Sequence, residues 1–326
     1  MKNNIPLVIL TGHRKSGTSL FHRLFDGVED INLYPVDMSL LYAYFPCFVN
    51  NKLSNQELKL RLVYVFKESI KRLTKDNKGL FDIKNLVKIF HGEIKNIDYK
   101  DKIDVLNAVF NTWAKYQKQS VNDKIFVFKE TSQAVHFNYY KSAFPNLKMI
   151  SVIRDPRDNY AAIKAGFAKH YAKIGEKKID SISSLINRAR MDLLSARENQ
   201  LNYPESFLTI KYEDLVLETE KTMKKVALFL GMNFNKNMLV PEVSGRGYTG
   251  NNWNGVKFSG ICSDNIGAWS TRITESESKV IEYWMSDVMK YWQYECKFNS
   301  IDSQVEFSKF YELYNCEYFY HDSFSK

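Results

Sequence analysis

A short apolar run followed by a loop with two glycines constrains this chain more than any other feature. Residues 7–10 are apolar without interruption, as expected for a buried strand of a parallel sheet. Residues 19–25 carry apolar side chains at helical spacing. Between these segments Gly12 and Gly17 have the glycine spacing of a P-loop, whose backbone N–H groups wrap a phosphate at a helix start. The segment therefore predicts an anion site between a strand and a helix.

The cations of this loop differ from those of a nucleotide-hydrolysing P-loop. Thr18 occupies the usual lysine position, and the lysine stands earlier, at Lys15, beside Arg14. A phosphate nest with cations at its rim remains. A P-loop kinase or NTPase is thus an alternative, but a weaker one without that lysine.

The rest of the chain alternates strand-like and helical segments, which predicts an α/β fold: a P-loop-like three-layer sandwich with a central, mainly parallel sheet. Further strands are expected at 125–128, 149–153 and 207–210, and helices at 180–200 and at 219–230, the latter ending at Gly231. Residues 54–119 read as an inserted helical layer and 297–326 as an aromatic tail, all within a single domain over 1–326.

Composition indicates an anionic partner without identifying it. The 326 residues have a net charge of +9, which suits nucleic acid, an anionic surface or a polyanionic small ligand. A nucleic-acid-binding protein is a second alternative, disfavoured because the basic residues of interest cluster at two phosphate-sized loops. Four cysteines (Cys47, Cys262, Cys296 and Cys316) form no CxxC pair and read as reduced thiols. With no signal peptide or membrane-spanning segment expected, we predict a cytoplasmic protein.

Two later segments complete a pattern. The strand at 149–153 runs into Arg154-Asp155-Pro156-Arg157-Asp158, which opens a helix. The strand at 207–210 runs into Lys211-Tyr212-Glu213-Asp214-Leu215, and a loop over residues 259–269 follows further on. In this order, the loop at 15–19 resembles the 5′-phosphosulfate loop of sulfotransferases that use 3′-phosphoadenosine 5′-phosphosulfate (PAPS). The motif style is most similar to the tyrosylprotein and heparan sulfate O-sulfotransferases.

The resemblance implies transfer of a sulfuryl group from PAPS to an acceptor hydroxyl, without a metal. Backbone N–H groups of residues 16–19 would hold the 5′-phosphate, and Lys15 would neutralise the bridging oxygen as the sulfuryl group leaves. Arg154 would be a forked donor to the 3′-phosphate, and Tyr212 would lie beside the adenine. The implied cofactor-binding residues are Arg14, Lys15, Ser16, Gly17, Thr18, Ser19, Arg154, Tyr212 and Ser263.

Two positions depart from the family's pattern at the 3′-phosphate. Ala162 stands where the family usually has a serine, so one hydroxyl contact is missing unless Asn159 or Tyr160 replaces it. Asn265 stands where an arginine is common.

Sulfuryl transfer also needs a base near the acceptor oxygen. By resemblance the base position is Asp37, which is equally suited to a helix N-cap; Glu130, at the end of the second predicted strand, is the rival. His13 and His136 are nearby, but a lone histidine is more often structural. The acceptor is expected to be a glycan or small-molecule hydroxyl, and Trp113, Trp253 and Tyr248 either line its pocket or belong to the core.

Overall fold

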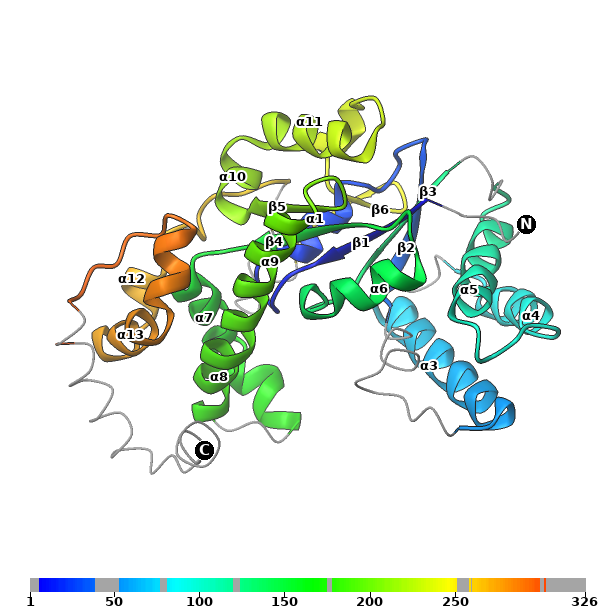
Figure 1. Cartoon of the computed structure of the whole chain (residues 1–326), viewed down its shortest axis with the longest axis horizontal. Coiled ribbons are helices and arrows are strands. Elements are labelled where there is room, and N and C mark those ends of the chain that lie inside the picture. The colour runs from blue at the N-terminus through cyan, green and yellow to red at the C-terminus, as the bar shows by residue number, and fades with distance from the viewer. Residues whose placement is uncertain are drawn as a thin grey trace.

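Five parallel strands form the central sheet in the order β2-β3-β1-β4-β5 (Figure 1). They are β1 (Leu7–Thr11), β2 (Ile31–Asp37), β3 (Ile125–Lys129), β4 (Lys148–Ile153) and β5 (Phe207–Lys211). The computed structural model describes residues 6–38, 53–76, 81–119, 124–174, 178–250, 258, 260–299 and 302. The predicted α/β sandwich with a mainly parallel sheet is confirmed, and β1 lies at its centre.

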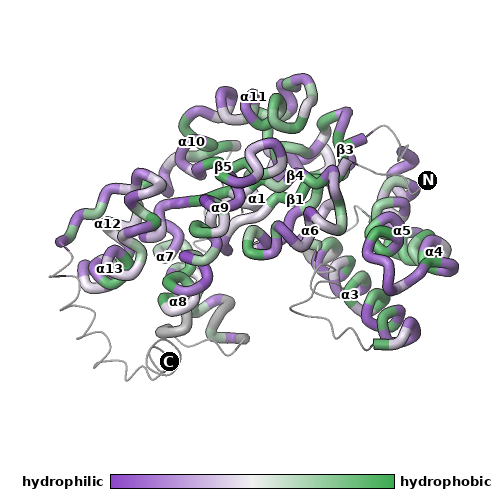
Figure 2. The backbone as a smooth tube through the Cα atoms, in the orientation of Figure 1, coloured by the Kyte–Doolittle hydropathy of each residue, from purple (hydrophilic) through white to green (hydrophobic). Residues whose placement is uncertain are grey.

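Alternation along the strands produces the two outer layers. Val8 and Leu10 of β1 face a core shared with α1 (Thr18–Arg23), α10 (Tyr212–Leu217) and α11 (Thr219–Leu230). Leu7 and Ile9 face the opposite core, to which α6 (Phe137–Ala143) and α9 (Arg190–Asn202) contribute. Figure 2 shows hydrophobic residues gathered along the central strands and hydrophilic residues recurring along the surface helices. Because successive strand side chains point to opposite faces, each strand serves both layers.

The edge strand β2 is absent from the four strands expected from sequence. Its apolar pattern is interrupted by Asn32, which is fully buried, and by Pro35. The pairing of β2 with β3 is irregular between Leu33 and Asp37, so Pro35 lies within the irregular stretch. Proline lacks an N–H donor and is tolerated on edge strands and at irregularities. Pro35 therefore interrupts the apolar pattern of β2 in the sequence but does not end the strand in the structure.

The region expected as a helical insert contains α3 (Asn55–Asp76), α4 (Ile83–Glu93) and α5 (Lys102–Tyr116). These helices share one hydrophobic core with the sheet, and the ring centroids of Phe110 on α5 and Phe126 on β3 are 4.1 Å apart. Figure 1 shows the three helices grouped beyond the β2 edge. This shared core supports our proposal that the insert belongs to a single domain with the sheet.

The remaining helices follow the expected boundaries closely. Helix α7 (Pro156–Ala165) begins with proline in its first turn and an Asp155 side-chain cap, and α11 ends at Gly231, whose φ of +76° is left-handed. The expected helix over 180–200 is continuous helical structure with a π-helical turn at Leu185–Ala189 between α8 (Lys178–Ser184) and α9. Further described elements after α11 are β6 (Glu242–Val243), β7 (Arg246–Gly247), α12 (Trp269–Arg272) and α13 (Glu275–Tyr291).

Within the part of the chain that the structure describes, no helix is both long and apolar enough to cross a membrane. The predicted aromatic tail lies almost wholly outside the described residues, and so does Trp253.

Candidate active site

The loop between β1 and α1 is shaped by its two glycines. Gly12 has a φ of +143° and Gly17 a φ of +101°, both in the region that favours glycine. A Cβ on Gly12 would lie 2.3 Å from the carbonyl oxygen of Val152, and a Cβ on Gly17 would lie 2.3 Å from Cδ2 of Tyr212. Neither position has room for a side chain, so the spacing noted in the sequence corresponds to two close approaches in space.

Two side chains hold the backbone of this loop, one from Arg154 directly after β4 and one from Asn159 on α7. The Asn159 side-chain amide donates a hydrogen bond to the Arg14 carbonyl at 2.7 Å, and Arg154 Nη1 donates to the Lys15 carbonyl at 3.1 Å. Lys15 itself has a φ of +67°, which is strained for a residue with a Cβ. These bonds hold the Lys15 backbone in a conformation that the isolated loop would disfavour.

Arg154 connects three segments that are distant in sequence. Its Nη2 donates to the Asn265 carbonyl at 2.6 Å, and its guanidinium lies 4.4 Å from the ring centroid of Tyr212. The buried Nε has no hydrogen-bond partner among the described residues. Each terminal nitrogen of the predicted forked donor is therefore already bonded to a backbone carbonyl.

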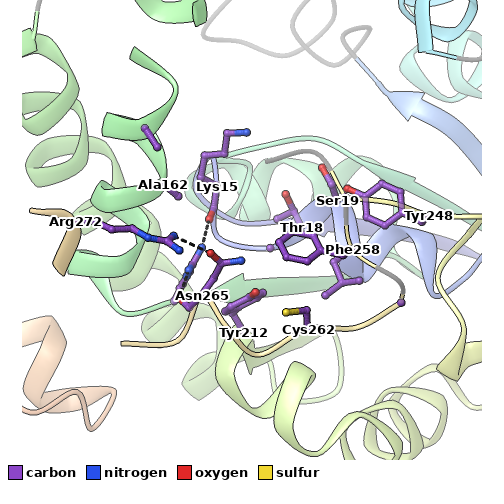
Figure 3. A pocket seen from close by; sticks show the side chains of 16 residues that line it. Lys15, Thr18, Ser19, Ala162, Tyr212, Tyr248, Phe258, Cys262, Asn265 and Arg272 are labelled. Atoms are coloured by element: carbon purple, nitrogen blue, oxygen red, sulfur yellow. Dashed lines mark hydrogen bonds between the residues drawn. The ribbon is translucent and has the colours of Figure 1, made fainter. Parts of the chain in front are cut away.

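A cleft opens beside the loop (Figure 3). We call it the central cleft. Its lining residues are Lys15, Gly17, Thr18, Ser19, Leu20, Arg154, Ala162, Ala165, Tyr212, Tyr248, Gly250, Phe258, Gly260, Cys262, Asn265 and Arg272. Six of the nine predicted cofactor-binding residues are among them: Lys15, Gly17, Thr18, Ser19, Arg154 and Tyr212.

The side chains of the other three predicted residues lie elsewhere. Ser16 is buried and lines a separate small cavity, and Arg14 is half-buried outside the central cleft. Ser263 is exposed, and its neighbours Cys262 and Asn265 line the cleft instead. Sequence reasoning did not single out Phe258 or Arg272, which lie in no recognisable motif and join the cleft through the path of the chain.

The two candidate bases meet at the ends of neighbouring strands. Asp37 ends β2, and Glu130 directly follows Lys129, the last residue of β3. Lys129 makes an ion pair with Asp37, with its Nζ 2.5 Å from Oδ1. The Glu130 side chain is buried, its Oε1 accepts the Thr131 N–H at 2.9 Å, and its Oε2 has no partner among the described residues. The parallel pairing of β2 and β3 thus brings both carboxylates and Lys129 to one edge of the sheet, at the carboxyl ends of these strands.

The electrostatics of this edge are set by burial and by like charges. Burial, together with the neighbouring Asp37 charge, raises the pKa of Glu130 to about 7. Burial, and then the positive charges of Lys129 and Arg154, lowers the pKa of Lys15 to about 8. Lys129 is therefore an electrostatic neighbour of both Lys15 and Glu130, a link that sequence reasoning missed. Its sequence signals are its place at the end of an apolar strand and its position directly before Glu130.

Other predicted residues lie in structural settings. His13 is buried with its Nδ1 3.5 Å from Asp192 Oδ2, and burial lowers its pKa. Burial also lowers the pKa of His136. Trp113 belongs to the core, whereas Tyr248 lines the central cleft. The segment after Met38 lies outside the described residues, so Asp37 as a helix N-cap stays a prediction.

Among the described residues, no group of three or more histidine, cysteine, aspartate or glutamate side chains is placed to hold a metal ion.

Comparison with known proteins identifies relatives. The family model described as the sulfotransferase family matches residues 6–236. Among solved structures, the sulfotransferase domain from the Synechococcus PCC 7002 olefin synthase has a TM-score of 0.55 at 15% identity, covering 90% of this chain and 97% of that one. The sulfotransferase domain from the curacin biosynthetic pathway also has a TM-score of 0.55, at 16% identity, covering 89% and 98%. At these identities the likeness is one of fold. No curated protein sequence is significantly similar to the chain.

Proposed function

The chain belongs to the sulfotransferase family, and on that premise we propose that it transfers a sulfuryl group from PAPS to the hydroxyl of a glycan or small-molecule acceptor. The observation that carries this proposal is the position of Lys15. It lines the central cleft, and its pKa is lowered in part by the charge of Lys129, which makes an ion pair with Asp37 and directly precedes Glu130. Neither carboxylate is among the residues that line the cleft. Lys15 would thus be linked to the proposed base through the charge of Lys129.

The described residues fit an adenosine nucleotide with two phosphate groups. Lys15, Arg154 and Arg272 supply positive charge along the cleft, while Tyr212, Tyr248 and Phe258 supply aromatic surface for a base. The absence of a Cβ at Gly17 lets the loop backbone approach the Tyr212 ring closely. By resemblance, the backbone N–H groups of residues 16–19 would hold the 5′-phosphate.

Each catalytic residue has a proposed role that agrees with its surroundings. PAPS, when bound, supplies the sulfuryl group. Lys15, still mostly protonated at pH 7 with a pKa of about 8, would neutralise the charge that develops on the bridging oxygen of the nucleotide. A carboxylate takes the acceptor's proton as the acceptor oxygen bonds to sulfur in line with the breaking bond.

Glu130 has a pKa well suited to a general base. A general base works best when its pKa lies near the operating pH, and that of Glu130 is about 7. Asp37 is committed to an ion pair with Lys129 and would hold that lysine in place. We therefore propose Glu130 as the proton acceptor and Asp37 as the residue that positions Lys129. The family match does not favour the P-loop kinase or nucleic-acid alternatives.

Calorimetric titration tests the donor. Adenosine 3′,5′-bisphosphate should bind more tightly than AMP or ATP, and without Mg²⁺, because kinase chemistry depends on that metal whereas sulfuryl transfer does not require it. Equal affinity for all three nucleotides would refute a PAPS site. Incubation with labelled PAPS and an extract of the host would then identify the sulfated acceptor.

A further inference from the structure

One wall of the central cleft is formed by α7 and by the segment that leads into α12. It contains Ala162, Asn265 and Arg272, and it lies on the side of Lys15 away from Ser19 and Tyr248 (Figure 3). This wall includes both positions at which the chain departs from the pattern described above. The donors available here decide how a second phosphate group can be bound.

At this wall, helix α7 does not supply a free hydroxyl or amide donor from Ala162, Asn159 or Tyr160 to an anion. Ala162 has no polar side-chain atom, and the two alternatives considered from sequence are engaged elsewhere. Asn159 donates its amide to the Arg14 carbonyl at 2.7 Å, and the Tyr160 hydroxyl donates to Glu277 Oε1 at 3.0 Å. Neither Asn159 nor Tyr160 therefore replaces the hydroxyl donor that is missing at position 162.

Some of the hydrogen-bond donors of Arg154 are already used within the protein. Both of its terminal nitrogens donate to backbone carbonyls, those of Lys15 and Asn265, and its guanidinium stacks on Tyr212. A guanidinium binds a phosphate best through two parallel N–H groups, and the carbonyls already take one N–H from each terminal nitrogen. Arg154 thus links the loop at Lys15 to Asn265. It would contribute positive charge to a bound phosphate more than two free parallel N–H donors.

Arg272 is the remaining cation among the described residues that line the cleft. It ends α12, its guanidinium points into the cleft, and Nη1 donates to Asn265 Oδ1 at 2.8 Å. No described carboxylate lies within ion-pair distance of it, whereas Arg157 pairs with Asp155 and Glu282. Its positive charge is therefore directed at the cleft and is not neutralised by a described carboxylate.

The segment that carries Arg272 is fixed in place. Asp158 accepts the backbone N–H groups of Gly267 at 2.7 Å and of Trp269 at 2.8 Å. The Arg157 guanidinium lies 4.1 Å from the centroid of the Trp269 ring system. Such anchoring lowers the entropy lost when a side chain at the end of α12 binds a ligand.

We infer that Arg272 is the principal hydrogen-bonding cation for the second phosphate group of the nucleotide, the one away from the loop, and that Asn265 is its positioning residue. This inference rests on the proposed use of a bisphosphate nucleotide. The arginine missing at position 265 is thereby replaced by one seven residues later, oriented by the asparagine amide oxygen.

Nucleotide selectivity tests this assignment. Arg272→Gln keeps most of the side-chain length and removes the charge. It should weaken adenosine 3′,5′-bisphosphate binding on the order of 10- to 100-fold, the usual range for a charged hydrogen bond, and change AMP binding less than about threefold. Asn265→Ala should lower the same selectivity by a smaller factor. Arg197→Ala, a control on α9 at a residue that does not line the cleft, should leave both affinities unchanged.

The outcomes separate this inference from the function it rests on. A wild-type protein that does not prefer the bisphosphate over AMP would refute the PAPS site. A wild-type protein that prefers it, together with an Arg272→Gln variant that keeps the preference or loses both affinities equally, would overturn the role of Arg272 alone. Thermal melting of each variant checks folding, and Arg272→Ala provides a second substitution with the same expected result should Arg272→Gln fail to fold.

Discussion

Replacing Glu130 by glutamine should stabilise the fold in a pH-dependent manner while removing activity. The carboxyl is 4% exposed, and burial beside Asp37 raises its pKa from 4.5 to about 7. Each tenfold change in acidity is worth about 1.4 kcal/mol, so ionising this group costs the folded protein about 3 kcal/mol. A glutamine cannot ionise, and its amide oxygen can still accept the hydrogen bond from the Thr131 N–H.

The sign of the effect follows from the direction of the pKa shift. Below pH 4.5 the carboxyl is protonated in both folded and unfolded chains, and no cost arises. Between pH 4.5 and 7 the unfolded chain releases the proton first, so wild-type stability falls as pH rises, and above pH 7 the cost is constant. The stability of Glu130→Gln relative to wild type should therefore increase by about 2 to 3 kcal/mol from pH 5 to pH 8.

Urea unfolding of both proteins at pH 5 and pH 8 measures this difference. The comparison between the two pH values cancels any constant cost of burying the amide group. An exposed control, Glu198→Gln on α9, should shift stability by less than about 0.5 kcal/mol at either pH. A Glu130→Gln variant whose relative stability does not change with pH would show that the buried carboxyl is not destabilised by its site. Glu130 would then not be a base with a pKa near neutral pH.

Three further predictions concern the loop and the second carboxylate. Gly17→Ala places a Cβ 2.3 Å from Tyr212 Cδ2 at a left-handed φ and should weaken bisphosphate binding at least tenfold by calorimetry, whereas Gly92→Ala, a helical site with nothing within 4 Å of the added Cβ, should keep full affinity. Activity should fall above about pH 8 as Lys15 loses its proton, and Lys15→Arg should move that alkaline limb upward if any turnover remains; a limb that stays in place would assign it to another group. Asp37→Asn should leave bisphosphate affinity within about twofold but lower turnover at least tenfold by unsettling Lys129, and an unchanged turnover would remove Asp37 from the site.

Much of the sheet was predictable because its strands are buried on both faces. Such strands read as continuous apolar runs, and four of the five were located from that pattern alone. The edge strand β2 was missed because Asn32 and Pro35 interrupt its pattern. Its position as an edge strand is what makes the proline acceptable. The apolar pattern was thus clear for the four inner or fully apolar strands and was interrupted in β2. This is the strand that ends at Asp37, one of the candidate bases.

Local chain geometry also made part of the candidate site predictable. Gly12 and Gly17 sit in the same short loop as Lys15, so their spacing in sequence directly reports a backbone shape. The contributions of Phe258 and Arg272 could not be read this way. They join the central cleft only through the path of the chain after β5 and through the anchoring of residues 267–269 by Asp158.

The linear order of residues determined the architecture of this protein and indicated its chemistry: a mainly parallel sheet, a phosphate-sized loop and one carboxylate, Glu130, at the end of a strand. These features depend on neighbouring residues, and a strand or a tight turn is encoded by the few residues that form it. The folded chain settled which charges act together. It commits the Arg154 terminal nitrogens to backbone carbonyls, brings Lys15 and Glu130 into the field of Lys129, and directs Arg272 into the cleft. Such relations depend on distance and burial, which distant parts of the chain define only when they meet.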